Sequence, residues 1–190
     1  PVTQNTKRFT RVFWALDKAL AYARHYPAIN WMNSYSEYFN DLDPWFKENL
    51  GDDFVEYRNK ISALLQEESS LMEIVKLIGS DVLPDDQKLV IETARAIRVG
   101  FLQQNAFDED DSYTALPKMY ALMNLVFSFD KKARLAIERG ADVADIAALP
   151  VRERIGRAKA VPMRDYAAAY AEIEAQIDAE LLALTQGGVQ

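Results

Sequence analysis

The sequence predicts an all-α fold: a helical bundle of about six or seven helices with no substantial sheet. Apolar residues recur at steps of three and four along most of the chain, and no segment sustains a two-residue alternation. The 190 residues are 49% hydrophobic, which is enough for a real core. We therefore expect one helical domain spanning residues 1–190.

Two helices are expected in the first third of the chain. In each, the apolar residues share one helical face: Phe9, Val12, Phe13, Leu16 and Leu20 in the first, and Phe54, Tyr57, Ile61 and Leu65 in the second. Asp53 and Glu56 have the spacing of an N-terminal capping pair for the second helix. Between them, the segment 25–44 is rich in Asn, Ser, Tyr and Trp, so we expect irregular structure there.

A third helix is expected to begin near Pro84. Proline fits the first helical turn, and the acids Asp85 and Asp86 favour the positive end of the helix dipole. Its apolar face consists of Leu89, Ala94, Ile97 and Phe101. The segment 79–84 before it and the segment 104–111 after it are predicted breaks.

Two more helices can be placed by their apolar spacing. The fourth has an apolar face made of Leu116, Tyr120, Met123 and Phe127, and Gly140 is its expected stop. After a break at 148–150, the last helix repeats apolar residues at three- and four-residue steps, namely Tyr166, Tyr170, Ile173, Ile177 and Leu181. The final residues, 186–190, are expected to be frayed.

Composition excludes several classes of site. A formal net charge of −7 argues against nucleic-acid binding, which needs a basic face. The absence of Cys and the single His25 argue against any metal site built from thiolates or several histidines. The longest uncharged apolar run, about 119–129, is far shorter than the roughly 20 residues of a membrane span.

The residues offer little catalytic chemistry by themselves. The seven glycines form no phosphate-binding loop, so we expect no phosphoryl transfer by this chain alone and assign no catalytic residue. His25 has no Ser or Cys signature beside it, which favours a structural histidine over a catalytic base. The acidic run 108–111 could bind a cation or transfer protons, but an acidic helix start is the favoured interpretation.

The most informative stretch is 101–113, which reads Phe-Leu-Gln-Gln-Asn-Ala-Phe-Asp-Glu-Asp-Asp-Ser-Tyr. It places two amides and two aromatic residues in a polar break between helices. Phe107 and Tyr113 could each cap a hydrophobic core where helices meet. Alternatively they could stack on a flat base, an interaction of about 1–3 kcal/mol with little sequence selectivity. The residues alone favour the core interpretation.

Together with Val-Phe-Trp-Ala-Leu-Asp (12–17) and His-Tyr-Pro-Ala-Ile-Asn-Trp (25–31), this stretch resembles the catalytic A subunit of V-type and archaeal-type rotary ATPases. The resemblance covers nearly the whole chain, but only the C-terminal part of that subunit. It implies that 1–6 is the tail of a nucleotide-binding domain that handles the phosphates and Mg²⁺ of ATP or ADP. No nucleotide is then expected to bind tightly to this chain alone.

The resemblance also implies an adenine site and a rotor contact. The adenine would pack on Phe107, with Gln104, Asn105 and Ala106 lining the same turn and Tyr113 as a second aromatic residue. The segment 79–88 resembles the helix–turn–helix tip that touches the central stalk. Here Asp81, Asp85 and Asp86 would form a charged rim around an apolar centre, Leu83. An ordinary interhelical turn is the alternative.

The family implies an ATPase or ATP synthase coupled to proton or sodium transport. Its expected partners are the B subunit of an alternating hexamer, the central stalk and a peripheral stalk. The protein would be cytoplasmic and would meet the membrane only indirectly, through the ion-translocating sector. The alternative is a stand-alone helical interaction module with no nucleotide role.

Overall fold

The computed structural model describes residues 2–186. Pro1 lies outside the described residues, and so does 187–190, which is most of the segment predicted to be frayed. Across the described residues there are eleven α-helices, one π-helix, one 3₁₀ helix and a single two-stranded sheet. This confirms the all-α prediction. The chain divides into two compact units, one up to Ser62 and one from Ala63 onward, which are described separately.

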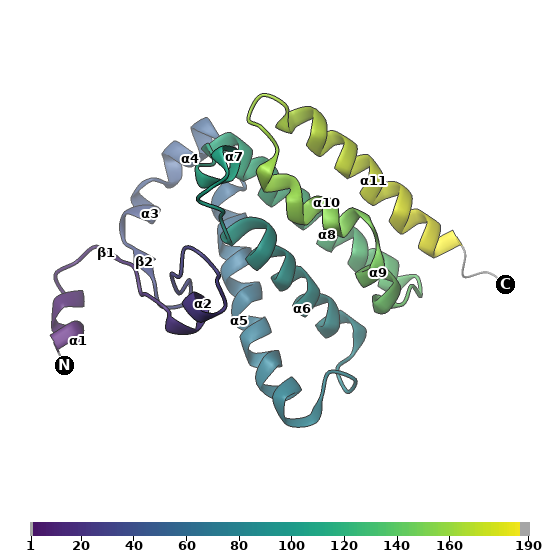
Figure 1. Cartoon of the computed structure of the whole chain (residues 1–190), viewed down its shortest axis with the longest axis horizontal. Helices are drawn as coiled ribbons and strands as arrows, with labels where there is room; N and C mark the ends of the chain where they lie inside the picture. The colour runs from purple at the N-terminus through teal and green to yellow at the C-terminus, as the bar shows by residue number, and fades with distance from the viewer. Residues whose placement is uncertain (1, 187–190) are drawn as a thin grey trace. The chain divides into compact units, whose positions relative to one another are not determined.

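The first unit is built from short elements (Figure 1). In chain order they are α1 (Val2–Lys7), β1 (Val12–Phe13), α2 (Lys18–Tyr22), β2 (Tyr35–Ser36), α3 (Tyr38–Asp41), α4 (Asp43–Asn49) and the first part of α5 (Phe54–Ile78). The strands are antiparallel, with Val12 opposite Ser36 and Phe13 opposite Tyr35. An isolated bridge between Leu16 and Ile29 extends the ribbon.

The prediction of one continuous helix through Phe9 and Leu20 is therefore wrong. Asp17 explains why: its side chain accepts hydrogen bonds from Ala19 N (2.8 Å) and Leu20 N (3.2 Å), so α2 begins only after it. The same carboxylate accepts a hydrogen bond from Asn30 Nδ2 at 2.7 Å. These contacts favour a ribbon before α2 over the helix that the apolar spacing suggested.

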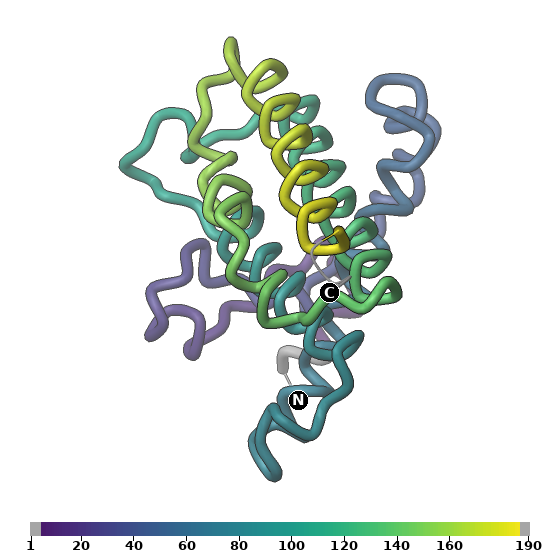
Figure 2. Tube along the Cα trace, turned by 90° about the vertical axis from the view of Figure 1, so that its right-hand side faces the viewer, coloured from purple at the N-terminus to yellow at the C-terminus, as the bar shows by residue number. Residues whose placement is uncertain are grey.

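The second unit is a helical bundle. After α5 come α6 (Asp85–Ile97), the π-helix η1 (Arg98–Leu102), α7 (Glu109–Ser112), α8 (Leu116–Glu138), α9 (Val143–Ala148), α10 (Val151–Arg157), the 3₁₀ helix η2 (Ala158–Ala160) and α11 (Tyr166–Gln186). The long helix α8 packs against α11 and α6, and Figures 1 and 2 show α11 running along α8. No helix within 2–186 is long and apolar enough to cross a membrane.

Several predicted boundaries of this bundle are confirmed. Helix α6 starts directly after Pro84, and α8 ends two residues before Gly140, whose φ of +94° suits glycine. On α11 the predicted face is buried at Tyr170, Ile173, Ile177 and Leu181. The short helices α7, α9 and α10 were not predicted, because each offers fewer than eight residues to a periodicity argument.

The third helix does not continue regularly to Phe101 as expected. It widens into the π-helix at Arg98, which pairs with the buried Glu68 of α5. Gly100 then meets α10: a Cβ atom placed on it would lie 3.3 Å from Cα of Gly156. The backbones of η1 and α10 therefore pack closely against each other at Gly100.

Candidate functional site

The candidate site is the segment 103–113, called the aromatic loop below, which connects η1 to α8 through α7. It is held by its own hydrogen bonds. Asn105 Oδ1 accepts from Phe107 N (3.1 Å), and Asn105 O accepts from Asp108 N (3.2 Å). Asp108 caps α7, accepting from Asp110 N at 2.9 Å. The turn around Phe107 is thus defined by local bonds at both ends.

Beneath the loop lies a group of charges, the buried Asp111 and Lys118 and the partly buried Lys159, called the lysine–aspartate cluster below. Asp111 Oδ2 accepts from Asn105 N at 2.8 Å and lies 3.4 Å from Lys159 Nζ. Lys118 Nζ donates to the carbonyl oxygens of Asp110 (3.0 Å) and Lys159 (2.6 Å). Lys159 also donates to the carbonyl of Gln103. The cluster ties the aromatic loop to α8 and η2.

Lys118 is an unusual member of a core: its side chain is 1% exposed. Burial lowers the pKa of its ammonium, and the nearby acids Asp110, Asp111 and Asp108 oppose that shift. The sequence carried a signal for this position. Lys118 precedes Leu122 and Leu125 at steps of four and seven, which places it on the buried face of α8.

Phe107 and Tyr113 both face solvent. Their side chains are 99% and 78% exposed, so neither caps a core within this chain. The interpretation that the residues alone favoured is wrong, because the side chains buried at this loop are those of Asp111 and Lys118 and not the two aromatic rings. The loop therefore presents two aromatic side chains on a backbone that is fixed from below.

The two amides of the predicted pocket help to build the loop. Gln104 Nε2 donates to the carbonyl of Asp111 at 3.1 Å, and Asn105 Oδ1 is engaged by Phe107 N. Ala106 is exposed beside Phe107. The structure thus gathers all five predicted residues in one loop, and it gives Gln104 and Asn105 a part in shaping that loop.

The acidic run and His25 have structural surroundings. Asp108 and Glu109 stand at the start of α7, as the helix-start interpretation predicts, but Asp111 is buried, with only 3% of its surface exposed. His25 is buried, with its ring centroid 5.5 Å from that of Trp31. Among residues 2–186, no three His, Cys, Asp or Glu side chains gather closely enough to hold a metal ion.

The α5–α6 turn projects from the second unit, at the bottom of Figures 1 and 2. Asp81 and Asp86 are exposed there, and Asp85 lies 3.3 Å from Lys88. Leu83, however, is only 5% exposed, so the expectation that it forms an exposed apolar centre is wrong. The backbone of Leu83 also closes the turn before Pro84, because Leu83 N donates to Ser80 O at 3.2 Å.

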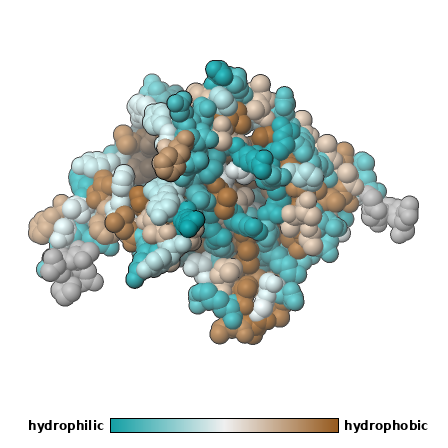
Figure 3. Space-filling model, viewed as in Figure 1, coloured by the Kyte–Doolittle hydropathy of each residue, from teal (hydrophilic) through white to brown (hydrophobic). Residues whose placement is uncertain are grey.

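Other apolar residues take that exposed place. Leu77 is 84% exposed, and Ile78 and Val82 are also more than half exposed. They surround Gly79, whose φ of +87° ends α5. Figure 3 shows apolar surface gathered at this projecting end. We call Leu77, Ile78 and Val82 the apolar tip.

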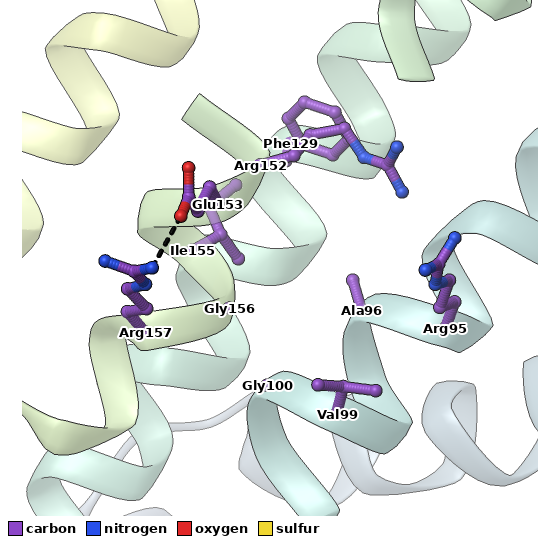
Figure 4. Close-up of a pocket in the computed structure, with 10 residues that line it drawn as sticks. All are labelled: Arg95, Ala96, Val99, Gly100, Phe129, Arg152, Glu153, Ile155, Gly156 and Arg157. Atoms are coloured by element: carbon purple, nitrogen blue, oxygen red, sulfur yellow. Dashed lines mark ion pairs between the residues drawn. The ribbon is translucent and has the colours of Figure 1, made fainter. Parts of the chain in front are cut away.

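A hollow of about 320 Å³ lies between α6, η1 and α10 (Figure 4). Its floor is mostly apolar, with Val99, Phe129 and Ile155 among its lining residues. Arginines stand at its rim, but two are already paired: Arg152 with Glu92, and Arg157 with Glu153 at 2.6 Å. These ion pairs offset the charges of Arg152 and Arg157.

A family model described as the C-terminal domain of V and A type ATP synthase matches residues 43–146. The match includes both the aromatic loop and the α5–α6 turn. It covers more than half of the chain. The elements outside it are α1 to α3 with the two strands, before residue 43, and α10, η2 and α11, after residue 146.

Three curated relatives extend the likeness. The V-type ATP synthase alpha chain 1 of Clostridium tetani is 49% identical over 165 residues, covering 87% of this chain and 28% of the relative. The V-type ATP synthase alpha chain of Halothermothrix orenii is 51% identical over 146 residues, 77% of this chain and 25% of the relative. That of Clostridioides difficile is 49% identical over 181 residues, 95% of this chain and 31% of the relative. The chain thus spans less than a third of their length.

Proposed function

The chain belongs to the family of V- and A-type ATP synthases and carries their C-terminal domain, and from this premise we propose that it forms the adenine-contacting side of a nucleotide pocket. The whole subunit would hydrolyse or synthesise ATP in step with proton or sodium transport. The observation that carries the proposal is Phe107, a fully exposed aromatic side chain on a loop whose backbone is fixed by hydrogen bonds.

The chemistry of the loop suits a nucleobase. A flat aromatic ring stacks on either face of a base and contributes about 1–3 kcal/mol. Phe107 can offer such a face without rearranging the loop, because its own backbone N–H is already bonded to Asn105. Tyr113, six residues further along, is the second aromatic side chain in the proposed pocket. Gln104, Asn105 and Ala106 would form the wall between them.

The triphosphate and its Mg²⁺ do not fit the residues described here. A phosphate site needs clustered backbone N–H groups and a lysine, and a Mg²⁺ site needs carboxylate or hydroxyl oxygens directed at one point. Phe107 and Tyr113 provide no lysine and no carboxylate, and the single hydroxyl of Tyr113 is not a set of oxygens directed at one point. We therefore assign the phosphate chemistry to the part of the longer relatives that this chain does not span, and we expect this chain alone to be inactive and to bind nucleotide weakly.

We propose that the α5–α6 turn is the contact with a central stalk. The apolar tip supplies exposed aliphatic surface, and the acids Asp81, Asp85 and Asp86 surround it. Leu83 supports the turn from inside and is not itself a contact. An apolar centre with a charged rim suits a surface that must engage and release a rotating partner.

The assembly that this function requires is the one expected from the sequence. The subunit would alternate with a B subunit in a hexamer around the central stalk, with a peripheral stalk outside. It would lie on the cytoplasmic side and reach the membrane only through the ion-translocating sector.

The decisive test is nucleotide affinity after removal of the Phe107 ring from the intact subunit in the assembled enzyme. The adenine role predicts a higher apparent constant for ATP with Phe107→Ala, and near-normal behaviour with Phe107→Trp. If the domain had no nucleotide role, Phe107→Ala would leave the apparent constant for ATP unchanged.

A further inference from the structure

We propose that Asp111, Lys118 and Lys159 are positioning residues for nucleotide binding: the buried lysine–aspartate cluster holds the aromatic loop in the orientation that stacks on the base. This inference rests on the proposed adenine contact of Phe107. None of the three side chains is expected to touch the nucleotide, because all lie beneath the loop and are largely buried.

The cluster fixes the entry of the loop first. Lys159 donates to the carbonyl of Gln103, and Asp111 accepts from Asn105 N at 2.8 Å. Lys159 Nζ also lies 3.4 Å from Asp111 Oδ2, so the two side chains that bind the loop backbone form an ion pair with each other. The backbone on the N-terminal side of Phe107 is thereby attached to the 3₁₀ helix η2, whose Lys159 lies 56 residues after Gln103 in the chain.

The cluster also fixes the exit of the loop. Lys118 donates to the carbonyl of Asp110 at 3.0 Å and to that of Lys159 at 2.6 Å. It therefore bridges α7 and η2 from its position on α8. Phe107 stands between an anchored entry and an anchored exit, joined through the same three side chains.

Burying the ammonium of Lys118 costs free energy, so this residue is not explained by the need to fill space in the core. An aliphatic side chain would occupy the position of Lys118 without the desolvation of a buried ammonium. What an aliphatic residue could not do is hold two backbone carbonyls at fixed positions. A fixed loop binds a base with less loss of conformational freedom, so its advantage should appear in nucleotide affinity.

Two variants test the cluster without removing Lys118 itself. Asp111→Asn keeps the shape of the side chain but removes its charge, and Lys159→Met removes the ammonium but keeps an aliphatic chain of similar length. Lys131→Met is the matched control, because Lys131 lies on the same helix as Lys118 but is exposed. Circular dichroism and a melting curve of the 190-residue chain establish that each variant is folded.

The first readout needs no nucleotide. Chymotrypsin cleaves after Phe107 only when the loop backbone opens locally, so the cleavage rate measures loop fixation. Cleavage after Phe9, which is exposed in the first unit, is the internal reference. Asp111→Asn and Lys159→Met should each raise the Phe107-to-Phe9 cleavage ratio about tenfold or more, since a buried partner is lost. Lys131→Met should leave the ratio unchanged.

The second readout is steady-state hydrolysis by the assembled enzyme. The two cluster variants should raise the apparent KM for ATP about threefold or more with kcat nearly unchanged, because they loosen binding and leave the chemistry alone. An unchanged cleavage ratio overturns the proposal, and so does a raised ratio without a change in KM. Global unfolding of both variants also overturns it, because the cluster would then support the whole fold.

The two proposals fail in different ways. If Phe107→Ala leaves KM unchanged, the adenine contact fails, whatever the cluster variants do to the cleavage ratio. If Phe107→Ala raises KM while Asp111→Asn and Lys159→Met do not, the adenine contact stands and the positioning role alone is refuted.

Discussion

Asp111 Oδ2 accepts a hydrogen bond from the backbone N–H of Asn105 at 2.8 Å, directly beneath a turn whose outermost side chain, Phe107, is 99% exposed. A buried carboxylate therefore holds the backbone while the aromatic ring remains free to contact another molecule. Because Asp111 holds the backbone and Phe107 supplies the exposed ring, substitutions can separate the stability of the loop from its contact with a ligand.

Phe107→Ala should leave the folding stability of the 190-residue chain nearly unchanged. An exposed side chain contributes little to the core, so the free energy of unfolding should shift by less than about 0.5 kcal/mol. Leu89→Ala is the contrasting control, since Leu89 is fully buried and its truncation should cost about 2–5 kcal/mol. Urea denaturation of both variants checks this. A loss with Phe107→Ala comparable to that with Leu89→Ala would mean that the ring is part of the core.

Leu83 and Val82 should differ in the same measurement, although they are neighbours. Leu83 is buried, so Leu83→Ala should lower the free energy of unfolding by about 2 kcal/mol or more. Val82 is exposed, so Val82→Ala should change it by less than about 0.5 kcal/mol. Equal effects of the two substitutions would contradict the inward orientation of Leu83.

Changing the apolar tip should uncouple the assembled enzyme without unfolding this domain. Serine at Leu77, Ile78 and Val82 removes exposed aliphatic surface, so we expect ATP hydrolysis to continue while ion transport per ATP falls. Alanine at Asp81, Asp85 and Asp86 should act in the same direction. Leu182→Ser, an exposed change on α11, is the control. Normal transport per ATP in the tip variants would refute the stalk contact.

Tyr170 should make stability depend on alkaline pH. Burial, and to a smaller extent the neighbouring Tyr166, raises the pKa of Tyr170 well above its ordinary value of 10.0. Because the folded-state pKa is the higher one, this contribution to stability is complete below pH 10 and is lost as the pH rises further. The hydroxyl also donates to Ala158 O at 2.9 Å.

Tyr170→Phe tests that dependence. At pH 8 the variant should be less stable by about 0.5–1.5 kcal/mol, because the hydrogen bond from the Tyr170 hydroxyl is lost while Val161 N still donates to Ala158 O at 3.1 Å. Above pH 10 the stability difference from wild type should shrink by about 1.4 kcal/mol per pH unit, since only wild type loses stability through this group. Denaturation curves between pH 8 and about pH 11 measure the difference. A constant difference would show that the tyrosine pKa is not raised.

The sequence was a good guide where helices are long. The apolar periodicities through Leu89 and Ile97, and through Ile173 and Ile177, match buried faces of α6 and α11. The periodicity failed between Phe9 and Leu20. There Asp17 caps the short helix α2, and the residues before it form a strand that pairs with residues 13 or more positions further along the chain. Pairing over that distance leaves no trace in a helical periodicity.

The candidate site was predictable in composition but not in geometry. Its five residues were found through their resemblance to a family, whereas the exposure of Phe107 contradicts what the residues alone favoured. The contribution of Lys159 depends on η2 folding back onto the loop, a contact between segments far apart in sequence. Lys118 was accessible in principle, because its spacing places a charge on an apolar face.

The adenine contact of Phe107 is tested most sharply by the apparent KM for ATP of Phe107→Ala in the intact, assembled enzyme, compared with that of Phe107→Trp. Loss of a stacking partner worth about 1–3 kcal/mol should raise KM roughly 5- to 150-fold. Phe107→Trp should stay close to wild type, because a flat ring is all that the contact needs. A KM for Phe107→Ala equal to that of wild type, in an enzyme that assembles and turns over normally, would contradict the adenine role of this loop.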